Sequence, residues 1–211
     1  MFHATIRTME AYSWKIPIVG NGAVGKTSLL LRLTQDTFSE NYQMTIGSNF
    51  STKTMLLPDG VEVRLQLWDL AGQPDFKLIR PSFYYGSKAC VYVYDVTSTQ
   101  SVSDLDLWKM EVEKHAPGIT GILLGNKADL TGSRQVASEV GEEIRKKLGL
   151  LAFWETSAKT GENVGKAFEF LAAHLVEEAR KRAKEGASPA GGGERRDTPR
   201  SGIGSNRTFE L

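Results

Sequence analysis

A glycine-rich segment near the start of the chain ends in a lysine and a threonine. It reads Gly20-Asn21-Gly22-Ala23-Val24-Gly25-Lys26-Thr27-Ser28 and matches the pattern G-x-x-x-x-G-K-[ST]. Glycines let consecutive backbone N–H groups point inward around an anion, and a following helix adds its positive end. Lys26 would reach the β and γ phosphates of a nucleotide, and the Thr27 hydroxyl would coordinate Mg²⁺. A glycine turn that only caps a helix would leave both residues unexplained.

A second candidate segment, Trp68-Asp69-Leu70-Ala71-Gly72-Gln73, follows an apolar run. Asp69, at the end of a predicted strand, would hold Mg²⁺ through a coordinated water. Gly72 offers a backbone N–H to a γ-phosphate, and Gln73 would orient an attacking water. Alone this pattern is weak, because a strand-ending aspartate more often caps a turn.

Two further segments would select the base. In Asn126-Lys127-Ala128-Asp129, the Asp129 carboxylate would accept N1–H and the 2-amino group of guanine, a donor pair that adenine lacks. Asn126 would read the N7 edge, and Lys127 would lay its aliphatic stem along the base. In Ser157-Ala158-Lys159 a backbone N–H would bind the guanine O6. Both segments follow predicted strands, where ligands of open α/β sheets bind.

The elements that position these residues follow from the apolar pattern. Strand-length apolar runs alternate with stretches of helical spacing, which is typical of an α/β layer structure. Only Pro58-Asp59-Gly60 separates the second and third runs, so this pair should be an antiparallel hairpin. Pro17 conflicts with a central strand: either one pairing is missing there or the strand is misplaced. We expect strands at Trp14–Val19, Asn49–Leu57, Val61–Trp68, Ala89–Asp95, Gly121–Gly125 and Leu151–Glu155, and a final helix at Val164–Lys184.

Length and composition limit the architecture. A chain of 211 residues suits one domain, and 26 basic against 25 acidic residues give a charge of +1 that would gather neither nucleic acid nor an anionic membrane. The only cysteine, Cys90, lies in an apolar run and is expected to be buried. The C-terminal composition of Gly, Ser, Pro and Arg predicts disorder. We expect an N-terminal extension at 1–13, one domain at 14–185 and a disordered tail at 186–211.

Five segments in one order, GNGAVGKTS, TIG, WDLAGQ, GNKAD and ETSAKTGENV, resemble the Ras superfamily of small GTPases. The resemblance implies a three-layer P-loop NTPase fold, with a six-stranded, mostly parallel sheet, one antiparallel strand and about five helices. It is closest to the Rab branch. That branch is favoured by Thr45-Ile46-Gly47, by Trp68 before Asp69, by Phe83-Tyr84-Tyr85-Gly86 and by SAKTGENV.

The resemblance implies further residue roles. Thr45 is similar to the first-switch threonine, which contacts Mg²⁺ and the γ-phosphate only in the GTP state. Phe38 matches the aromatic residue that packs across the guanine base. Phe50, Trp68 and Phe83 match the aromatic triad that Rab-like proteins present to effectors, although each would also suit an ordinary core.

A GTP/GDP switch is the function that the resemblance implies. Lys26, Thr45 and Gln73 would be the catalytic residues, with Mg²⁺ as cofactor. Loss of the γ-phosphate would release the segments around Thr45 and from Gly72 to Tyr85, so the output is a change of surface. We expect a monomer. Its intrinsic hydrolysis would be slow, because no helical insertion between Lys26 and Thr45 could supply an arginine finger in cis, and an activating protein would add ~10³ to 10⁵ in rate. Exchange factors, activating proteins and effectors would all bind the switch segments.

Two departures from the Rab pattern stand out. Pro74 replaces the usual glutamate after Gln73, which restricts Gln73 to extended backbone angles and removes an N–H. No cysteine follows Cys90 and residue 2 is Phe2, so we expect neither prenyl nor myristoyl attachment. No stable membrane anchor is therefore predicted. The expected location is the cytoplasm, with recruitment to a membrane by partner proteins left open.

Two other interpretations stay open. One is a binding module of the same fold that holds nucleotide permanently as a scaffold, an idea supported only by Pro74 and the missing anchor. The other is a P-loop kinase or ATPase, which is disfavoured because Asp129 suits guanine and no lid or second substrate site is visible.

Overall fold

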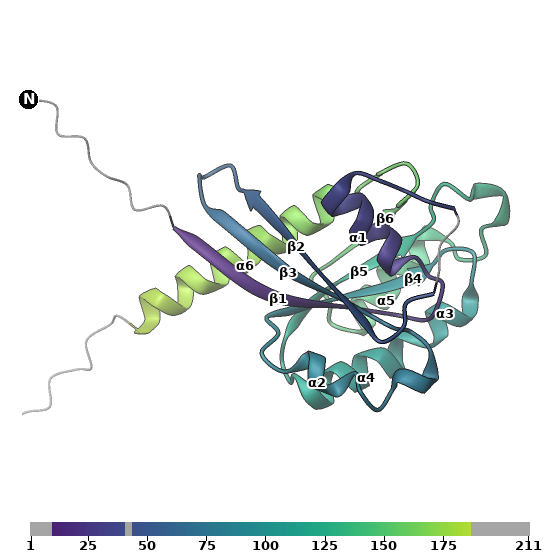
Figure 1. Cartoon of the computed structure of the whole chain (residues 1–211), viewed down its shortest axis with the longest axis horizontal. Helices are drawn as coiled ribbons and strands as arrows, with labels where there is room; N and C mark the ends of the chain where they lie inside the picture. Colours follow the sequence, from purple (N-terminus) through teal and green to yellow (C-terminus); the bar gives the residue numbers. More distant parts are fainter. Residues whose placement is uncertain (1–9, 41–43, 187–211) are drawn as a thin grey trace, which may run out of the picture.

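The computed structural model describes residues 10–40 and 44–186, which form one six-stranded sheet with helices on both faces (Figure 1). The strands are β1 (Ala11–Val19), β2 (Ser48–Leu56), β3 (Glu62–Leu70), β4 (Ala89–Asp95), β5 (Thr120–Asn126) and β6 (Ala152–Thr156). The helices are α1 (Lys26–Gln35), α2 (Pro81–Tyr84), α3 (Thr99–Ser103), α4 (Leu105–His115), α5 (Ser138–Lys147) and α6 (Val164–Gly186), with 3₁₀ turns η1 (Pro74–Phe76) and η2 (Thr131–Ser133).

The predicted domain limits fall partly outside these residues. Residues 1–9 of the expected extension and 187–211 of the expected tail lie outside the described ranges. β1 begins at Ala11 rather than Trp14, because its first residues continue the pairing with β3 at Glu62. The other predicted strands and the last helix match the observed bounds within two residues.

The strand order is β2-β3-β1-β4-β5-β6. All neighbours are parallel except β2 and β3, which pair antiparallel. The hairpin closes where the Leu57 N–H donates to the Val61 carbonyl at 2.9 Å, and Gly60 takes a positive φ of 83°. The predicted hairpin and the predicted α/β fold class are confirmed. Because β2 runs backwards, its first residue, Ser48, pairs with Leu70 at the end of β3.

Pro17 fits because one pairing is missing. It lies in register with Trp68 of β3, while pairing of β1 with β4 covers only Ile18 and Val19. The Lys15 carbonyl accepts a hydrogen bond from the Lys88 N–H, so that side of β1 faces β4. The backbone polar groups of residues two apart on a strand point to the same side, so those of Pro17 face β4 as those of Lys15 do. The N–H that Pro17 lacks would therefore have faced β4 just ahead of the paired residues Ile18 and Val19.

Two cores flank the sheet. On one face α1 and α6 pack with buried residues such as Leu29, Phe168 and Leu171, which confirms the apolar repeat predicted for the last helix. On the other face α2, α4 and α5 pack around β4, where Cys90 is fully buried as predicted (Figure 1). No helix among the described residues is both long and apolar enough to cross a membrane. The carboxyl ends of the parallel strands meet at one edge of the sheet, the usual location of a ligand site.

We expect Gly141→Ala to destabilise the protein although it raises helix propensity. A Cβ on Gly141 in α5 would lie 2.2 Å from Cζ of Phe153, so the ring must move. The expected loss is about 1–3 kcal/mol in the free energy of unfolding, measured in urea. Gly165→Ala in α6 is the matched control, because its Cβ would meet nothing within 4 Å and should stabilise by up to about 1 kcal/mol. Equal shifts for both variants would contradict this packing.

Candidate functional site

The segment between β1 and α1 forms a loop around the Lys26 side chain. Gly20 and Gly25 take positive φ values of 142° and 93°, and a Cβ on Gly20 would lie 2.1 Å from the Val93 carbonyl oxygen. α1 starts without a side-chain cap, so its first N–H groups face the loop. Lys26 folds back over the loop, and its Nζ donates to the carbonyls of Gly20 at 2.7 Å and Asn21 at 2.8 Å.

The positively charged side chain of Lys26 is almost fully buried. The residue is only 6% exposed. Burial lowers the pKa of Lys26 to about 8, although the nearby Asp69 carboxylate opposes the shift. A buried ammonium of this kind is stabilised by an anion beside it. The loop and Lys26 therefore have the geometry and the charge that a phosphate group needs.

Three predicted metal-binding residues come together beside this loop. The Thr27 and Thr45 hydroxyl oxygens lie 2.8 Å apart. Both hydroxyls donate to Oδ2 of Asp69, the one from Thr45 at 3.2 Å. Asp69 is 1% exposed, and its Oδ1 is buried without a hydrogen-bond partner among the described residues. Burial raises the pKa of the Asp69 carboxyl, with the Thr27 hydrogen bond and the Lys26 charge opposing that rise.

This donor set fits Mg²⁺. Two hydroxyls and a carboxylate are hard oxygen ligands, and Oδ1 of Asp69, which no described residue hydrogen-bonds, suits a metal-bound water. Among the described residues there is no group of three or more His, Cys, Asp or Glu that would hold a metal by itself. A cation here would depend on phosphate oxygens to complete its shell, as is usual for Mg²⁺.

Gly72 and Gln73 lie directly over the phosphate loop. A Cβ on Gly72 would lie 2.4–2.5 Å from backbone atoms of Gly20, Asn21 and Gly22, so only glycine fits. Gln73 has φ −72° and ψ 148°, which confirms the extended backbone predicted from Pro74. Its Nε2 lies 3.5 Å from the Met44 sulfur, and its Oε1 is buried without a hydrogen-bond partner among the described residues.

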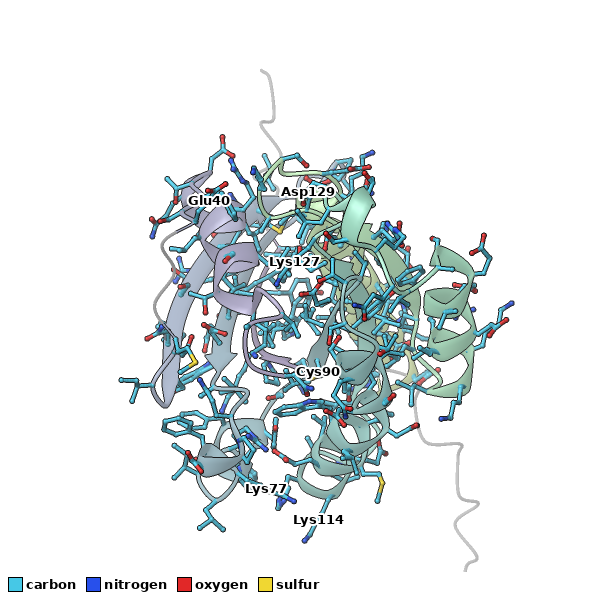
Figure 2. The ribbon with its side chains drawn as sticks, turned by 90° about the vertical axis from the view of Figure 1, so that its right-hand side faces the viewer. Glu40, Lys77, Cys90, Lys114, Lys127 and Asp129 are labelled. Atoms are coloured by element: carbon cyan, nitrogen blue, oxygen red, sulfur yellow. The ribbon has the colours of Figure 1, made fainter. Side chains whose placement is uncertain are left out.

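The predicted base-binding residues, except Ser157, line a second cavity of about 310 Å³. Glu40, Lys127 and Asp129 lie at the same end of the molecule (Figure 2). Ser157 donates from Oγ to Oδ1 of Asp129 at 2.6 Å, which ties the two motifs together. The cavity is lined by Ala23, Gly25, Ser28, Phe38, Ser39, Glu40, Asn126, Lys127, Asp129, Leu130, Ala158 and Lys159.

Asn126 joins the base cavity to the phosphate loop. The residue is 1% exposed, and its Nδ2 donates to the Val24 carbonyl at 2.9 Å. Its Oδ1 accepts from the Ala158 N–H at 3.3 Å. One amide thus connects three segments that are far apart in the sequence. Contact of Asn126 with the N7 edge of a base stays a prediction.

Lys127 is held in an unusual backbone conformation. It has φ 67°, and its Nζ pairs with Asp95 at 2.6 Å. Sequence reasoning missed Asp95, although it is the last residue of β4, much as Asp69 is the last but one of β3, and that position could have indicated it.

Sequence reasoning also missed the Glu40–Lys159 pair at the rim and the Arg32 side chain beneath it. Nζ of Lys159 lies 2.9 Å from Oε1 of Glu40, and Arg32 donates to the Ala158 and Lys159 carbonyls. No motif marks these contacts, because they join segments distant in sequence.

A mostly parallel sheet whose first strand leads through a glycine loop and a buried lysine into a helix defines a P-loop nucleotide-binding protein. The model of the Ras family matches residues 15–177, and the chain belongs to the Ras family. Proteins of this family are small GTPases that switch between GTP-bound and GDP-bound states, generally with Mg²⁺.

We expect Asn126→Asp to destabilise the protein, because Asn126 connects the phosphate loop to the base cavity. The change removes the Nδ2 donor to Val24 and turns a buried amide into a carboxylate facing a carbonyl. The expected loss is about 1–3 kcal/mol in the free energy of unfolding, measured in urea without added nucleotide. Asn49→Asp is the control, since Asn49 lies exposed on β2. An unchanged midpoint for Asn126→Asp would rule out its bridging role.

Proposed function

We propose that the chain binds GTP with Mg²⁺ and hydrolyses it slowly to GDP and phosphate, acting as a Rab-like molecular switch of residues 14–185. One observation carries this proposal. Lys26, Thr27, Thr45, Asp69 and Gln73 come from three separate segments, and their side chains gather around one glycine loop. A structural loop would need none of these side chains.

The phosphate end of the site supplies the catalytic roles. Lys26 would bind the β and γ phosphates, and the hydroxyls of Thr27 and Thr45 would hold Mg²⁺, with Asp69 binding one of its waters. Mg²⁺ would neutralise charge on the transferred phosphoryl group. Gln73 would orient the attacking water through its buried Oε1, which has no hydrogen-bond partner in the described part of the chain. The Gly72 N–H would hold the γ-phosphate.

Asp129 would select guanine at the other end. The Ser157 hydroxyl donates to Oδ1 of Asp129. The other carboxylate oxygen, Oδ2, would then face the N1–H and the 2-amino group of guanine. Phe38 and Lys127 would cover the two faces of the base, and a backbone N–H of Ser157-Ala158-Lys159 would bind O6. The loop from Gly20 to Ser28 would wrap the phosphates between these ends.

Effector binding is proposed at the aromatic triad. Ring centroids are 5.1 Å apart for Phe50 and Trp68 and 5.4 Å apart for Trp68 and Phe83. Phe50 is 53% exposed, and Lys15 lies over the Trp68 ring at 5.0 Å. The triad bridges β2, β3 and α2, between the segments that the γ-phosphate would order. Exchange factors and activating proteins would approach the same surface of a cytoplasmic protein.

A nucleotide-locked scaffold is the second candidate function. Its support is Pro74, which holds the Gln73 backbone extended and begins η1. A glutamine that cannot reach the attacking water would leave GTP bound and intact.

Gln73→Leu distinguishes the two functions. In single-turnover assays with Mg²⁺ and GTP, the unchanged protein should release phosphate slowly, and the variant at least about tenfold more slowly, because leucine cannot hydrogen-bond the water. ATP in place of GTP should give no release. Tight GTP binding with no phosphate release from the unchanged protein would instead support the scaffold.

Asp129→Asn should shift the base preference from GTP toward XTP. An asparagine amide can donate to the 2-carbonyl of xanthine but loses the guanine donor pair, so GTP affinity should fall about a hundredfold. Competition against labelled GDP measures both affinities. Asp36→Asn, which alters an exposed carboxylate paired with Arg32, is the control. An Asp129→Asn protein that still prefers GTP would contradict the assignment.

A further inference from the structure

Arg80 is buried just before α2 and reaches two sides of the Gly72 segment. Its residue is 5% exposed. Its Nη1 donates to the Gln73 carbonyl at 3.0 Å and the Ala71 carbonyl at 3.4 Å. One guanidinium group therefore holds the backbone on both sides of Gly72.

The same guanidinium is fixed to α4. Its Nε and Nη2 each donate to one carboxylate oxygen of Glu111 at 2.8 Å, a bidentate pair. The Tyr84 hydroxyl donates to the same carboxylate at 2.7 Å. Burial raises the pKa of Glu111, but the hydrogen bonds from Arg80 and Tyr84 outweigh it and hold the pKa below its usual value. Glu111 is thus a charged anchor for Arg80.

Trp108 links this anchor to the phosphate loop. The Arg80 guanidinium lies 4.4 Å from the centroid of the Trp108 ring. The Trp108 Nε1 donates to Oδ1 of Asn21 at 2.8 Å, and Nδ2 of Asn21 donates to Asp104 at 2.6 Å. Asp104, which caps the start of α4, and Trp108 and Glu111 within it are spaced four and three apart, so they lie on one side of the helix. That side binds both the phosphate loop and the Gln73 segment.

The distance between these two segments matters for the proposed reaction. Gln73 must place its side chain over the loop, while Pro74 has already removed one backbone donor of its own segment. η1 and α2 are short, with three and four residues, and η1 supplies one hydrogen bond to the Gln73 carbonyl, from the Phe76 N–H at 3.2 Å. Arg80 adds side-chain hydrogen bonds to the carbonyls of Ala71 and Gln73.

We propose that Arg80 and Trp108 are positioning residues, which use α4 to set the place of Gln73 over the phosphate loop and so determine the rate of hydrolysis. This inference rests on the proposed GTP hydrolysis. Neither side chain touches the nucleotide in this assignment. Their removal should therefore slow the reaction while leaving nucleotide affinity almost unchanged.

A purely structural role makes a different prediction. If Arg80 only stabilised the fold, its loss would lower the midpoint of unfolding and loosen the nucleotide together. It would also slow hydrolysis by the same factor whether or not Gln73 were present, because independent effects add in free energy. A positioning role requires that the effect vanish without Gln73.

The test uses Arg80→Lys and Trp108→Phe in the full chain. Lysine keeps the charge but cannot bind Glu111 bidentately and reach the Gln73 carbonyl at once. Phenylalanine keeps a ring under Arg80 but loses the donor to Asn21. The matched controls are Arg145→Lys, from a surface pair with Glu142 on α5, and Trp154→Phe on β6. Each variant is also made with Gln73→Leu.

Single-turnover phosphate release and dissociation of labelled GDP are measured for every variant. We expect Arg80→Lys to slow release about ten- to a hundredfold, the size of effect that a small misplacement causes. Trp108→Phe should act in the same direction, and it keeps the test informative if Arg80→Lys folds poorly. GDP dissociation should stay within about twofold of the unchanged protein. In the Gln73→Leu background neither change should slow release further.

Three results would overturn the inference. Unchanged release from Arg80→Lys and Trp108→Phe would do so while leaving the proposed GTPase intact. If the two variants slowed phosphate release equally with and without Gln73, they would show a structural role instead. So would GDP dissociation that became faster by the same factor by which phosphate release became slower. Absence of phosphate release from the unchanged protein would overturn the proposed hydrolysis together with this inference.

Discussion

Lys26 places a positive charge where only 6% of the residue meets solvent. Such a charge is tolerated only with compensating polar groups, because burial disfavours the ammonium form. Here the carbonyls of Gly20 and Asn21 and the Asp69 carboxylate supply part of that compensation. A bound phosphate would supply the rest. The loop must therefore bring its backbone very close to Lys26 and to the sheet. This closeness requires Gly20, whose Cβ would overlap the Val93 carbonyl.

The strand directions bring the remaining groups to this charge. β1, β3, β4, β5 and β6 are parallel, so their carboxyl ends lie on one edge. β2 is antiparallel, and its start pairs with the end of β3. That reversal puts Thr45, which precedes β2, within hydrogen-bond distance of Thr27 and Asp69. One hairpin of three loop residues thus determines where the Thr45 segment meets the proposed metal site.

Side-chain connections then join the parts of this edge. Asn126 fixes the phosphate loop to the base cavity through Val24 and Ala158. On the other side Trp108 fixes the loop to α4 through Asn21. The loop is held from both directions, which suits a site that must stay rigid while the neighbouring segments change. The segment at Gln73 is held in addition by the buried Arg80, which donates to the Gln73 carbonyl.

The sequence by itself determined the α/β fold class, the hairpin and the family, because glycine loops, strand-ending carboxylates and apolar periods are local patterns. Family membership was confirmed over residues 15–177, whereas the Rab branch and the residue roles stay proposals. The missing pairing at Pro17, the Asp95 partner of Lys127 and the contacts of Arg80 were decided only by the tertiary structure. Each of these three features depends on how residues from different elements are placed relative to one another. Their proximity depends on strand order and helix packing, which no local spacing encodes.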